Sequence, residues 1–513
     1  MLHNSNKIDW AVMSISGGLL LVFVLMSLFN AALVGEWVNT SFQFSTTYFG
    51  GFWQILMLLT FLIALAIAFS KYGRVQLGNM QTPEMSTFKW IAIIMCTLLA
   101  GGGVFWAAAE PMQHFLSSPP MYDEVESGTA EAILPAMSQS FLDWGFLAWA
   151  ILGTLSAIVL MYGHFSKGMP MKPRTLLYPL FGEKIMHKSV LGTLVDAFSI
   201  IAVAAGTIGP IGFLGLQASY GINSLFGIPD TFMTQLTIIF ALILIASISA
   251  VTGVHRGIQI LSRFNVIFTF ILIILVLLLG PGAFIIDSFI GGFGVYISDF
   301  FETSLYRGDG EWLSFWTIFF WGWFIGYGPM MAIFISRISR GRTIRELVTA
   351  VAIIAPIVTN FWFSVVGGSG IFYELQTAGS VSEPLDSGGM PAAMIAIVEQ
   401  IPYGTALAAA FLLVTIVFVA TTSDSMSFTI SMAVTGGGNP SSMLRVFWAV
   451  TMGAVASVLL FIGESSVDAL QSFIVFTAVP VSLILLPMLW LAPQVAGKMA
   501  RDQGIVPNYS TTK

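Results

Sequence analysis

The sequence predicts an all-α polytopic membrane protein with twelve transmembrane helices, and two properties of the chain carry this prediction. First, 56% of the 513 residues are hydrophobic and only 9% are charged, with a mean hydropathy of +0.87. Soluble domains carry about 25% charged residues, so this chain lacks the polar side chains that a water-facing surface requires. Second, stretches of roughly 18 or more apolar residues recur from end to end, and each is long enough to cross a bilayer core of about 30 Å.

The predicted spans follow the apolar windows of the sequence. The first window is longer than the apolar region of a signal peptide, so we interpret it as a retained span. A further stretch, 284–306, is apolar on one side and acidic elsewhere, which is typical of a helix lying in the membrane interface. The twelve spans are 10–33, 50–70, 88–109, 138–163, 190–222, 231–253, 260–280, 312–336, 346–367, 404–432, 443–463 and 470–492.

Three runs rich in glycine and proline indicate helices that are either broken or closely packed. They are Gly101–Gly103 in the third span, Gly206–Gly212 in the fifth and Gly326–Pro329 in the eighth. Close packing through small residues is common in membranes, and this alternative stays open for each run. Spans three and eight are five apart, as corresponding broken helices are in two inverted five-helix repeats.

This spacing predicts five parts of the chain, two of which are the repeats. The parts are 1–87 (N-terminal tail and spans 1–2), 88–283 (first repeat, spans 3–7), 284–311 (interfacial amphipathic helix), 312–492 (second repeat, spans 8–12) and 493–513 (short cytoplasmic tail).

Basic residues predict the orientation. With the N-terminus inside, 19 of the 20 lysines and arginines fall in cytoplasmic segments, and only Arg307 falls outside. Segments 164–189, 254–259 and 337–345 are therefore predicted to face the cytoplasm, because short cytoplasmic loops collect lysine and arginine. Segments 111–137 and 368–403 are predicted to face outward, and both termini to lie inside.

Several classes of protein are excluded by composition. A single cysteine, Cys96, cannot form a disulfide framework, a cysteine-based zinc site or an iron–sulfur centre. Five histidines are scattered along the chain without a metal-binding motif, which disfavours a polytopic membrane enzyme and predicts no cofactor. The net charge of −6 is spread over loops, so no basic patch indicates nucleic acid.

Aromatic side chains are concentrated in the eighth span, between Trp316 and Tyr327. Positions 316, 320, 323, 324 and 327 share one helical face. Such rings can form an aromatic belt at the membrane edge, but Trp323 and Tyr327 fall well inside the predicted span. Ring faces gathered inside a bilayer indicate a cage for a cation without N–H groups, such as a quaternary ammonium.

At this motif the sequence resembles the betaine–choline–carnitine transporter (BCCT) family. The family signature W-T-x-x-[FY]-W-x-W-W is nearly reproduced from Trp316 to Phe324, and R-I-S-[KR]-G-[RK]-x-[IV]-R-E from Arg337 to Glu346. The resemblance implies a LeuT-type fold, a homotrimer in the bacterial inner membrane and carriage of a zwitterionic or cationic osmolyte. Further landmarks follow in order along the chain: Glu110-Pro111, Trp144-Gly145 with Trp149, Gly206-Thr207 and Thr421 to Ser425.

The resemblance also implies a substrate site, an aromatic box formed by the fourth and eighth spans. Phe324 and Tyr327 replace tryptophans of the family, and consecutive glycines replace the alternating glycines of betaine carriers. These departures keep a cage but leave the identity of the substrate open. The substrate-binding residues implied are Trp144, Trp149, Trp323, Phe324 and Tyr327, with Trp106, Gly101, Gly102 and Gly103 from the third span.

A sodium site is predicted from oxygen ligands, because a hard cation at mid-membrane needs hydroxyl and carbonyl oxygens where carboxylates are lacking. Thr421 and Thr422 match the hydroxyl pair of the family's sodium site, with backbone oxygens near Leu99 and Gly102 opposite. For most threonines in a span, a hydroxyl bonded back to its own helix is the simpler explanation. A second family site needs two threonines, and here Thr207 is present but Val203 stands in for the other.

Three acidic residues have simpler interpretations than ligand binding. Asp424 is expected to pair with a basic residue, with an ion or proton role as the alternative. Asp143 is expected to be a solvated acid at a helix start near the outer mouth. Glu110 is expected to cap or pair at the outer end of the third span.

These observations together predict a secondary-active transporter that imports a small osmolyte by alternating access, driven by sodium. The first alternative is a proton-coupled or exchange transporter for choline, carnitine, dimethylsulfoniopropionate or a sulfonate. A channel is a further alternative. The expected partners are the osmolyte, the lipid bilayer and two further copies of the chain.

Overall fold

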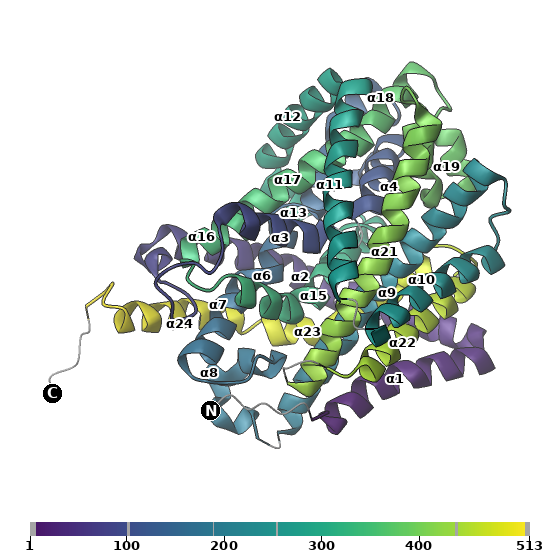
Figure 1. Ribbon diagram of the computed structural model, residues 1–513. Coiled ribbons are helices and arrows are strands. Elements are labelled where there is room, and N and C mark those ends of the chain that lie inside the picture. Colours follow the sequence, from purple (N-terminus) through teal and green to yellow (C-terminus); the bar gives the residue numbers. More distant parts are fainter. Residues whose placement is uncertain (1–6, 100–102, 188, 253–254, 437–439, 508–513) are drawn as a thin grey trace, which may run out of the picture.

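The computed structural model describes residues 7–99, 103–187, 189–252, 255–436 and 440–507, and it is built of helices (Figure 1). No strand occurs in these ranges, where the one bridge of extended chain joins Gln76 to Thr343. Ten helical segments are long and apolar enough to cross a membrane, or eleven if a bent pair is counted. The prediction of an all-α polytopic membrane protein is therefore confirmed.

Most helix boundaries follow the apolar windows in the first part of the chain, although α2 begins 19 residues before the predicted second span. The predicted fourth span consists of three short helices in sequence, α5 to α7. The helices are α1 (Trp10–Phe29), α2 (Ala31–Phe69), α3 (Thr87–Leu99), α4 (Gly103–Leu116), α5 (Ile133–Asp143), α6 (Phe146–Gly153), α7 (Leu155–Met161), α8 (Tyr178–Phe181), α9 (Val190–Phe226), α10 (Phe232–Thr252), α11 (His255–Leu279), α12 (Gly282–Ser298) and α13 (Phe300–Ser304).

The second part of the chain agrees equally well, although α24 carries the helix ten residues beyond the predicted last span. The helices are α14 (Gly310–Phe315), α15 (Thr317–Ile338), α16 (Ile344–Thr349), α17 (Ala355–Phe363), α18 (Ser369–Gln376), α19 (Ser382–Gly388), α20 (Ala393–Glu399), α21 (Gly404–Thr435), α22 (Ser442–Ile462), α23 (Asp468–Leu485) and α24 (Met488–Asp502). Short π-helical turns join α16, α17 and α18 into one continuous segment.

In two of the three glycine-rich runs the helix is unbroken, as the close-packing alternative predicts. α9 runs unbroken through Gly206–Gly212, and α15 runs unbroken through Gly326–Pro329. A methyl group on Gly212 would lie 2.4 Å from the side chain of Leu470, so this glycine serves the close contact between α9 and α23. Of the third glycine run, Gly101 and Gly102 lie outside the described residues.

The helices are interrupted instead at two tryptophans. Trp144 and Gly145 separate α5 from α6, and Trp316 separates α14 from α15. Gly145 is required there, because a Cβ atom would lie 2.0 Å from the backbone oxygen of Phe141 and 2.4 Å from the Tyr296 hydroxyl. The backbone therefore leaves the helical path beside two large rings.

Contacts between loops separate the molecule into two ends. At one end, here called the basic end, Leu77 donates to the backbone oxygen of Arg342 (2.8 Å) and the Asn79 amide to that of Phe165 (2.7 Å). At the opposite end, Tyr122 donates to Asp299 (3.1 Å) and Ser224 to Glu399 (2.7 Å). The segments predicted to share a side of the membrane therefore lie together.

The centre of the molecule is formed by the fourth, fifth and eighth spans. About 94% of the most apolar window is buried in the segments Ala130–Ser166 and Val190–Phe226, against 28% in α1 and 33% in α10. In Figure 1, α1 lies at the edge of the bundle, while α15 and α9 lie inside it. α11 and α12 form the bent pair, with an angle of 105°, so α12 turns away from the direction of α11 near the predicted interfacial stretch.

Candidate functional site

Rings from five helical segments meet at the centre of the molecule and form what we call the aromatic cluster. It includes the predicted residues Trp106, Trp144, Trp323 and Phe324, none of which is more than 8% exposed. The segments are α4, the α5–α6 junction, α9, α15 and α17. The members are Trp106, Trp144, Phe213, Phe319, Phe320, Trp323, Phe324 and Phe363.

Trp144 lies at the helix interruption and contacts four rings of the cluster. Its ring centroid lies 5.4 Å from that of Phe324 and 5.9 Å from that of Trp323, both edge to face. The rings of Phe320 and Phe363 lie at 5.2 and 5.1 Å. The fourth and eighth spans thus bring their aromatic residues together, as the resemblance implies.

Trp323 is held in place by the fifth span. Its indole N–H donates to the backbone oxygen of Gly206 (3.0 Å), and a methyl group on Gly206 would lie 2.6 Å from the Tyr327 ring and 3.1 Å from the Trp323 nitrogen. The Tyr327 hydroxyl lies 3.4 Å from that of Thr207. The Gly206-Thr207 pair therefore makes room for two aromatic side chains and orients them.

Trp106 extends the cluster towards the third span. Its ring centroid lies 5.0 Å from Phe320 and 5.4 Å from Phe213. Phe213 and Phe363 belong to no motif that the sequence analysis used. Phe213 could have been found from the sequence, because it directly follows the glycine-rich run of α9. Phe363 has no such sequence signal, because only the packing of α17 brings it beside Trp144.

Two predicted site residues lie apart from the aromatic cluster. Trp149 is 2% exposed, and in the described part of the chain its ring contacts none of the cluster rings. Gly103 begins α4, and its backbone oxygen accepts a hydrogen bond from the Trp362 indole (2.8 Å), so it stabilises helix packing.

The predicted sodium ligands are only partly described. Thr421 is buried in α21, and its hydroxyl donates to the backbone oxygen of Val417 (2.8 Å). This bond uses the proton and leaves the lone pairs of the Thr421 oxygen available to a cation. Thr422 is half-buried on the same helix, and Leu99 is the last residue of α3. Gly102, the other predicted backbone ligand, lies outside the described residues.

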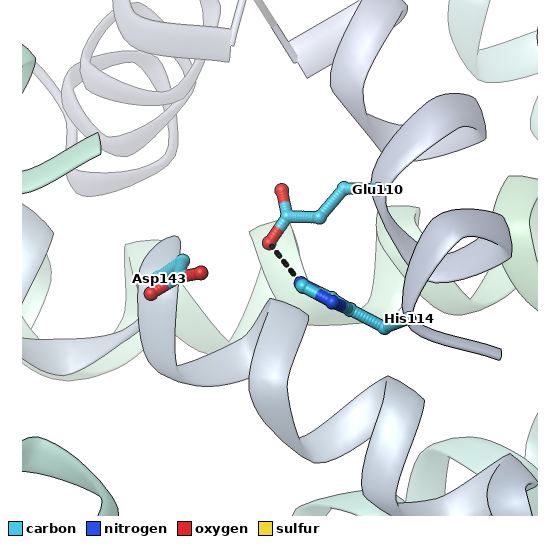
Figure 2. Close-up of side chains that lie close together, drawn as sticks. All are labelled: Glu110, His114 and Asp143. Carbon is cyan, nitrogen blue, oxygen red and sulfur yellow. Dashed lines mark ion pairs between the residues drawn. The ribbon is translucent and has the colours of Figure 1, made fainter. Parts of the chain in front are cut away.

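A buried polar group adjoins the aromatic cluster, formed by Glu110, His114 and Asp143, and we call it the polar triad (Figure 2). Trp144 donates its indole N–H to Glu110 (2.7 Å), and His114 lies 3.7 Å from the same carboxylate. Glu110 is therefore paired, as expected, through the Trp144 indole. The prediction for Asp143 is wrong, because it is fully buried and ends α5 instead of starting a helix.

Asp424, in contrast, has the structural partner that was expected. It forms a buried ion pair with Arg445 at 2.7 Å, which links α21 to α22.

A cavity of about 870 Å³ opens at the end of the molecule opposite the basic end. It is lined by Gln113 of α4, Leu216 and Tyr220 of α9, and the loops around Asp230 and Asp468. Leu216 lies one helical turn from Phe213, so the cavity approaches the aromatic cluster from that side.

The comparison with known proteins decides the family. The sequence model of the betaine/carnitine/choline family transporters matches residues 11–501. The chain belongs to the BCCT family. This membership confirms the resemblance seen in the sequence and places the chain among transporters, not enzymes.

BCCT relatives resemble the chain over nearly its whole length. The glycine betaine transporter 2 of Vibrio parahaemolyticus is 54% identical, over 98% of this chain and 92% of the relative. The ectoine/hydroxyectoine transporter of Virgibacillus pantothenticus is 30% identical, over 95% and 96%. An osmo-independent choline transporter of Acinetobacter baylyi is 32% identical, over 90% and 88%. As a BCCT member, the chain is an osmolyte transporter with a small-molecule substrate and a place in a membrane.

Proposed function

We propose that this BCCT transporter imports a glycine-betaine-like zwitterion or quaternary ammonium, which binds between Trp144, Trp323 and Phe324. The observation that carries the proposal is the ring geometry around Trp144. A quaternary ammonium has no N–H to donate, so ring faces are its best partners, and each desolvated contact contributes about 2 kcal/mol. The name of the relative at 54% identity supports betaine over choline or ectoine.

Transport by alternating access fits the position of the aromatic cluster. The cluster is buried at the centre, with the 870 Å³ cavity approaching it from one end and ion-paired loops at the basic end. Opening one end while the other is closed would expose the cluster to each side in turn. A LeuT-type arrangement of two repeats and a homotrimer in the inner membrane belong to the same proposal.

Sodium is the proposed coupling ion. The hydroxyl oxygens of Thr421 and Thr422 follow each other on α21, and Val203 supplies no hydroxyl for a second site. We therefore expect one sodium ion for each transport cycle. Since sodium loses most of its water on binding, removal of both hydroxyls takes away ligands that the protein must supply.

Uptake by purified protein in liposomes tests this proposal. Betaine uptake driven by an inward sodium gradient should depend on sodium with a Hill coefficient near one. The paired substitutions Thr421→Val and Thr422→Val keep the side-chain shape and should abolish sodium stimulation, while Thr429→Val on the same helix serves as the control. A Hill coefficient near two would contradict the single site. Equal uptake in potassium would favour the proton-coupled or exchange alternative.

The orientation has its own test, because the basic end is proposed to face the cytoplasm with both termini. Single cysteines at the exposed positions Lys167 and Thr377 are introduced into a Cys96→Ser background. An impermeant thiol reagent added to intact cells should modify position 377 and leave position 167 unmodified. The reverse pattern would contradict the orientation.

A further inference from the structure

We propose that the polar triad Glu110, His114 and Asp143 is a binding site for one divalent transition-metal ion, of which Zn²⁺ is the best match. Glu110 and His114 lie one turn apart on α4, and Asp143 reaches them from the end of α5. One ligand atom from each residue lies within 4.8 Å of the other two. Figure 2 shows the two carboxylates and the imidazole around a common space.

The atoms of the triad that face this space have no partners outside the triad. Glu110 Oε1, His114 Nε2 and Asp143 Oδ1 are all buried and receive no hydrogen bond from a side chain outside the triad, although the two carboxyl groups lie close enough to share a proton. An unmade hydrogen bond inside a protein is costly, and the His114–Glu110 separation of 3.7 Å is too long for a hydrogen bond. These three atoms lie within 4.8 Å of one another, so one ion could bind all three.

The opposite atoms of both carboxylates are held in position. Trp144 donates to Glu110 Oε2 at 2.7 Å, and Gln139 donates to Asp143 Oδ2 at 3.0 Å while also donating to Thr317 at 3.0 Å. Metal sites commonly orient their ligands in this way, with a second ring of hydrogen-bond donors behind the carboxylates. The free oxygen of each carboxylate is thereby left for a ligand.

Charge points to a cation in the same place. Neither Glu110 nor Asp143 forms an ion pair with a lysine or arginine among the described residues, and His114 is their one basic neighbour. Two ionised carboxylates in a low-dielectric site are stabilised by a positive partner. A divalent ion would balance both charges and leave the imidazole neutral, as a metal ligand must be.

The donor set selects the kind of ion. One imidazole nitrogen with two carboxylate oxygens suits zinc and related transition metals, whereas calcium and magnesium prefer oxygen alone. Zinc at about 2.1 Å from each ligand would place the ligands about 3.4 Å apart. His114 Nε2 and Glu110 Oε1 lie 3.7 Å apart and no pair of ligand atoms is more than 4.8 Å apart, so the side chains need to close by about 0.3 Å for that pair and by no more than about 1.4 Å for any other.

Metal binding at the triad would act on the aromatic cluster through one shared residue. Glu110 joins the triad and also holds the indole of Trp144 at 2.7 Å. Bound metal would fix this carboxylate and with it the ring that faces Phe324 and Trp323, so Zn²⁺ should alter substrate affinity. This coupling rests on the proposed function, whereas metal binding itself does not.

Titration of the purified full-length protein in detergent with Zn²⁺ tests the site. We expect saturable binding of one ion per chain and a rise in the melting temperature, with no such response to Mg²⁺. Co²⁺ in the same site should give a visible ligand-field band. His114→Ala and the nearly isosteric Asp143→Asn should each weaken Zn²⁺ binding by tenfold or more, while His187→Ala, at an exposed histidine, should not.

Three outcomes are decisive. Equal Zn²⁺ affinity in wild type and both triad variants, with the variants folded by size-exclusion chromatography, would overturn the site. Absence of saturable binding in wild type would also overturn it. Binding lost with His114→Ala, but without any change in betaine affinity when Zn²⁺ is added, would uphold the metal site and contradict only its coupling to the substrate.

Discussion

Two groups of buried charges differ in how the fold satisfies them. At the basic end, Asp196 is fully buried and bonded twice by Arg174, through the side chain at 2.7 Å and the backbone N–H at 2.8 Å. Arg174 also approaches Asp9 at 3.4 Å, which ties the chain before α1 to α9. Beside the aromatic cluster, Glu110 and Asp143 are equally buried but have no arginine or lysine as an ion-pair partner among the described residues.

The difference separates a structural role from a functional one. A buried carboxylate that forms an ion pair with an arginine of the same chain has its charge balanced by the fold. Its removal should therefore lower the stability of the protein. A buried carboxylate without an arginine or lysine can instead coordinate a ligand, so its removal should affect binding. Three predictions test this distinction, from the largest expected effect to the smallest.

The first prediction concerns the complete pair. Asp196→Ala leaves Arg174 buried without its main partner, which costs about 3–5 kcal/mol in the free energy of unfolding. Asp143→Asn keeps an oxygen for the Gln139 amide and should cost no more than about 1 kcal/mol, the size of one hydrogen bond. Unfolding of the detergent-solubilised protein with increasing SDS measures both. Equal destabilisation by the two variants would contradict the distinction between a structural carboxylate at Asp196 and a binding carboxylate at Asp143.

The second prediction compares two tryptophans that the sequence analysis treated alike. Trp323→Leu keeps bulk but removes a ring face from the aromatic cluster, so the Kd for betaine should rise roughly 5- to 150-fold, or about 1–3 kcal/mol. Trp149→Leu makes the same chemical change outside the cluster and should leave the Kd within about twofold. Calorimetric titration in sodium buffer gives both values. An unchanged Kd for Trp323→Leu would rule out the cage.

The third prediction compares the buried ion pair of Asp196 with an exposed one. Arg340 and Glu84 lie 2.7 Å apart at the basic end, and each side chain is 35% exposed. Because solvent screens such pairs, Glu84→Gln should cost only about 0.2–1 kcal/mol, and less in high salt. The same unfolding assay applies. If Glu84→Gln lowered the free energy of unfolding as much as Asp196→Ala, burial would not determine how much each ion pair contributes to stability.

The sequence by itself determined the class of fold, the placement of most spans and the family. Apolar length is a property of each segment alone, so windows such as 190–222 and 443–463 predict α9 and α22 to within a few residues. The residue order from Trp316 to Phe324 carries the family resemblance in the same local way. The partition of basic residues likewise needs no knowledge of packing, and the loop contacts group the segments as it predicts.

Only the tertiary structure decided where the helices are interrupted and which side chains meet. Glycine and proline mark flexible or closely packed positions without distinguishing the two. Only the structure shows that α9 is unbroken through Gly206–Gly212 and that Gly212 lies close to Leu470. Phe363 joins the aromatic cluster, and Trp149 lies outside it, because of how α17 and α6 pack against α15 and its neighbours. His114 and Asp143 are 29 positions apart in the sequence. Their meeting depends on the packing of α4 against α5, which no local pattern encodes.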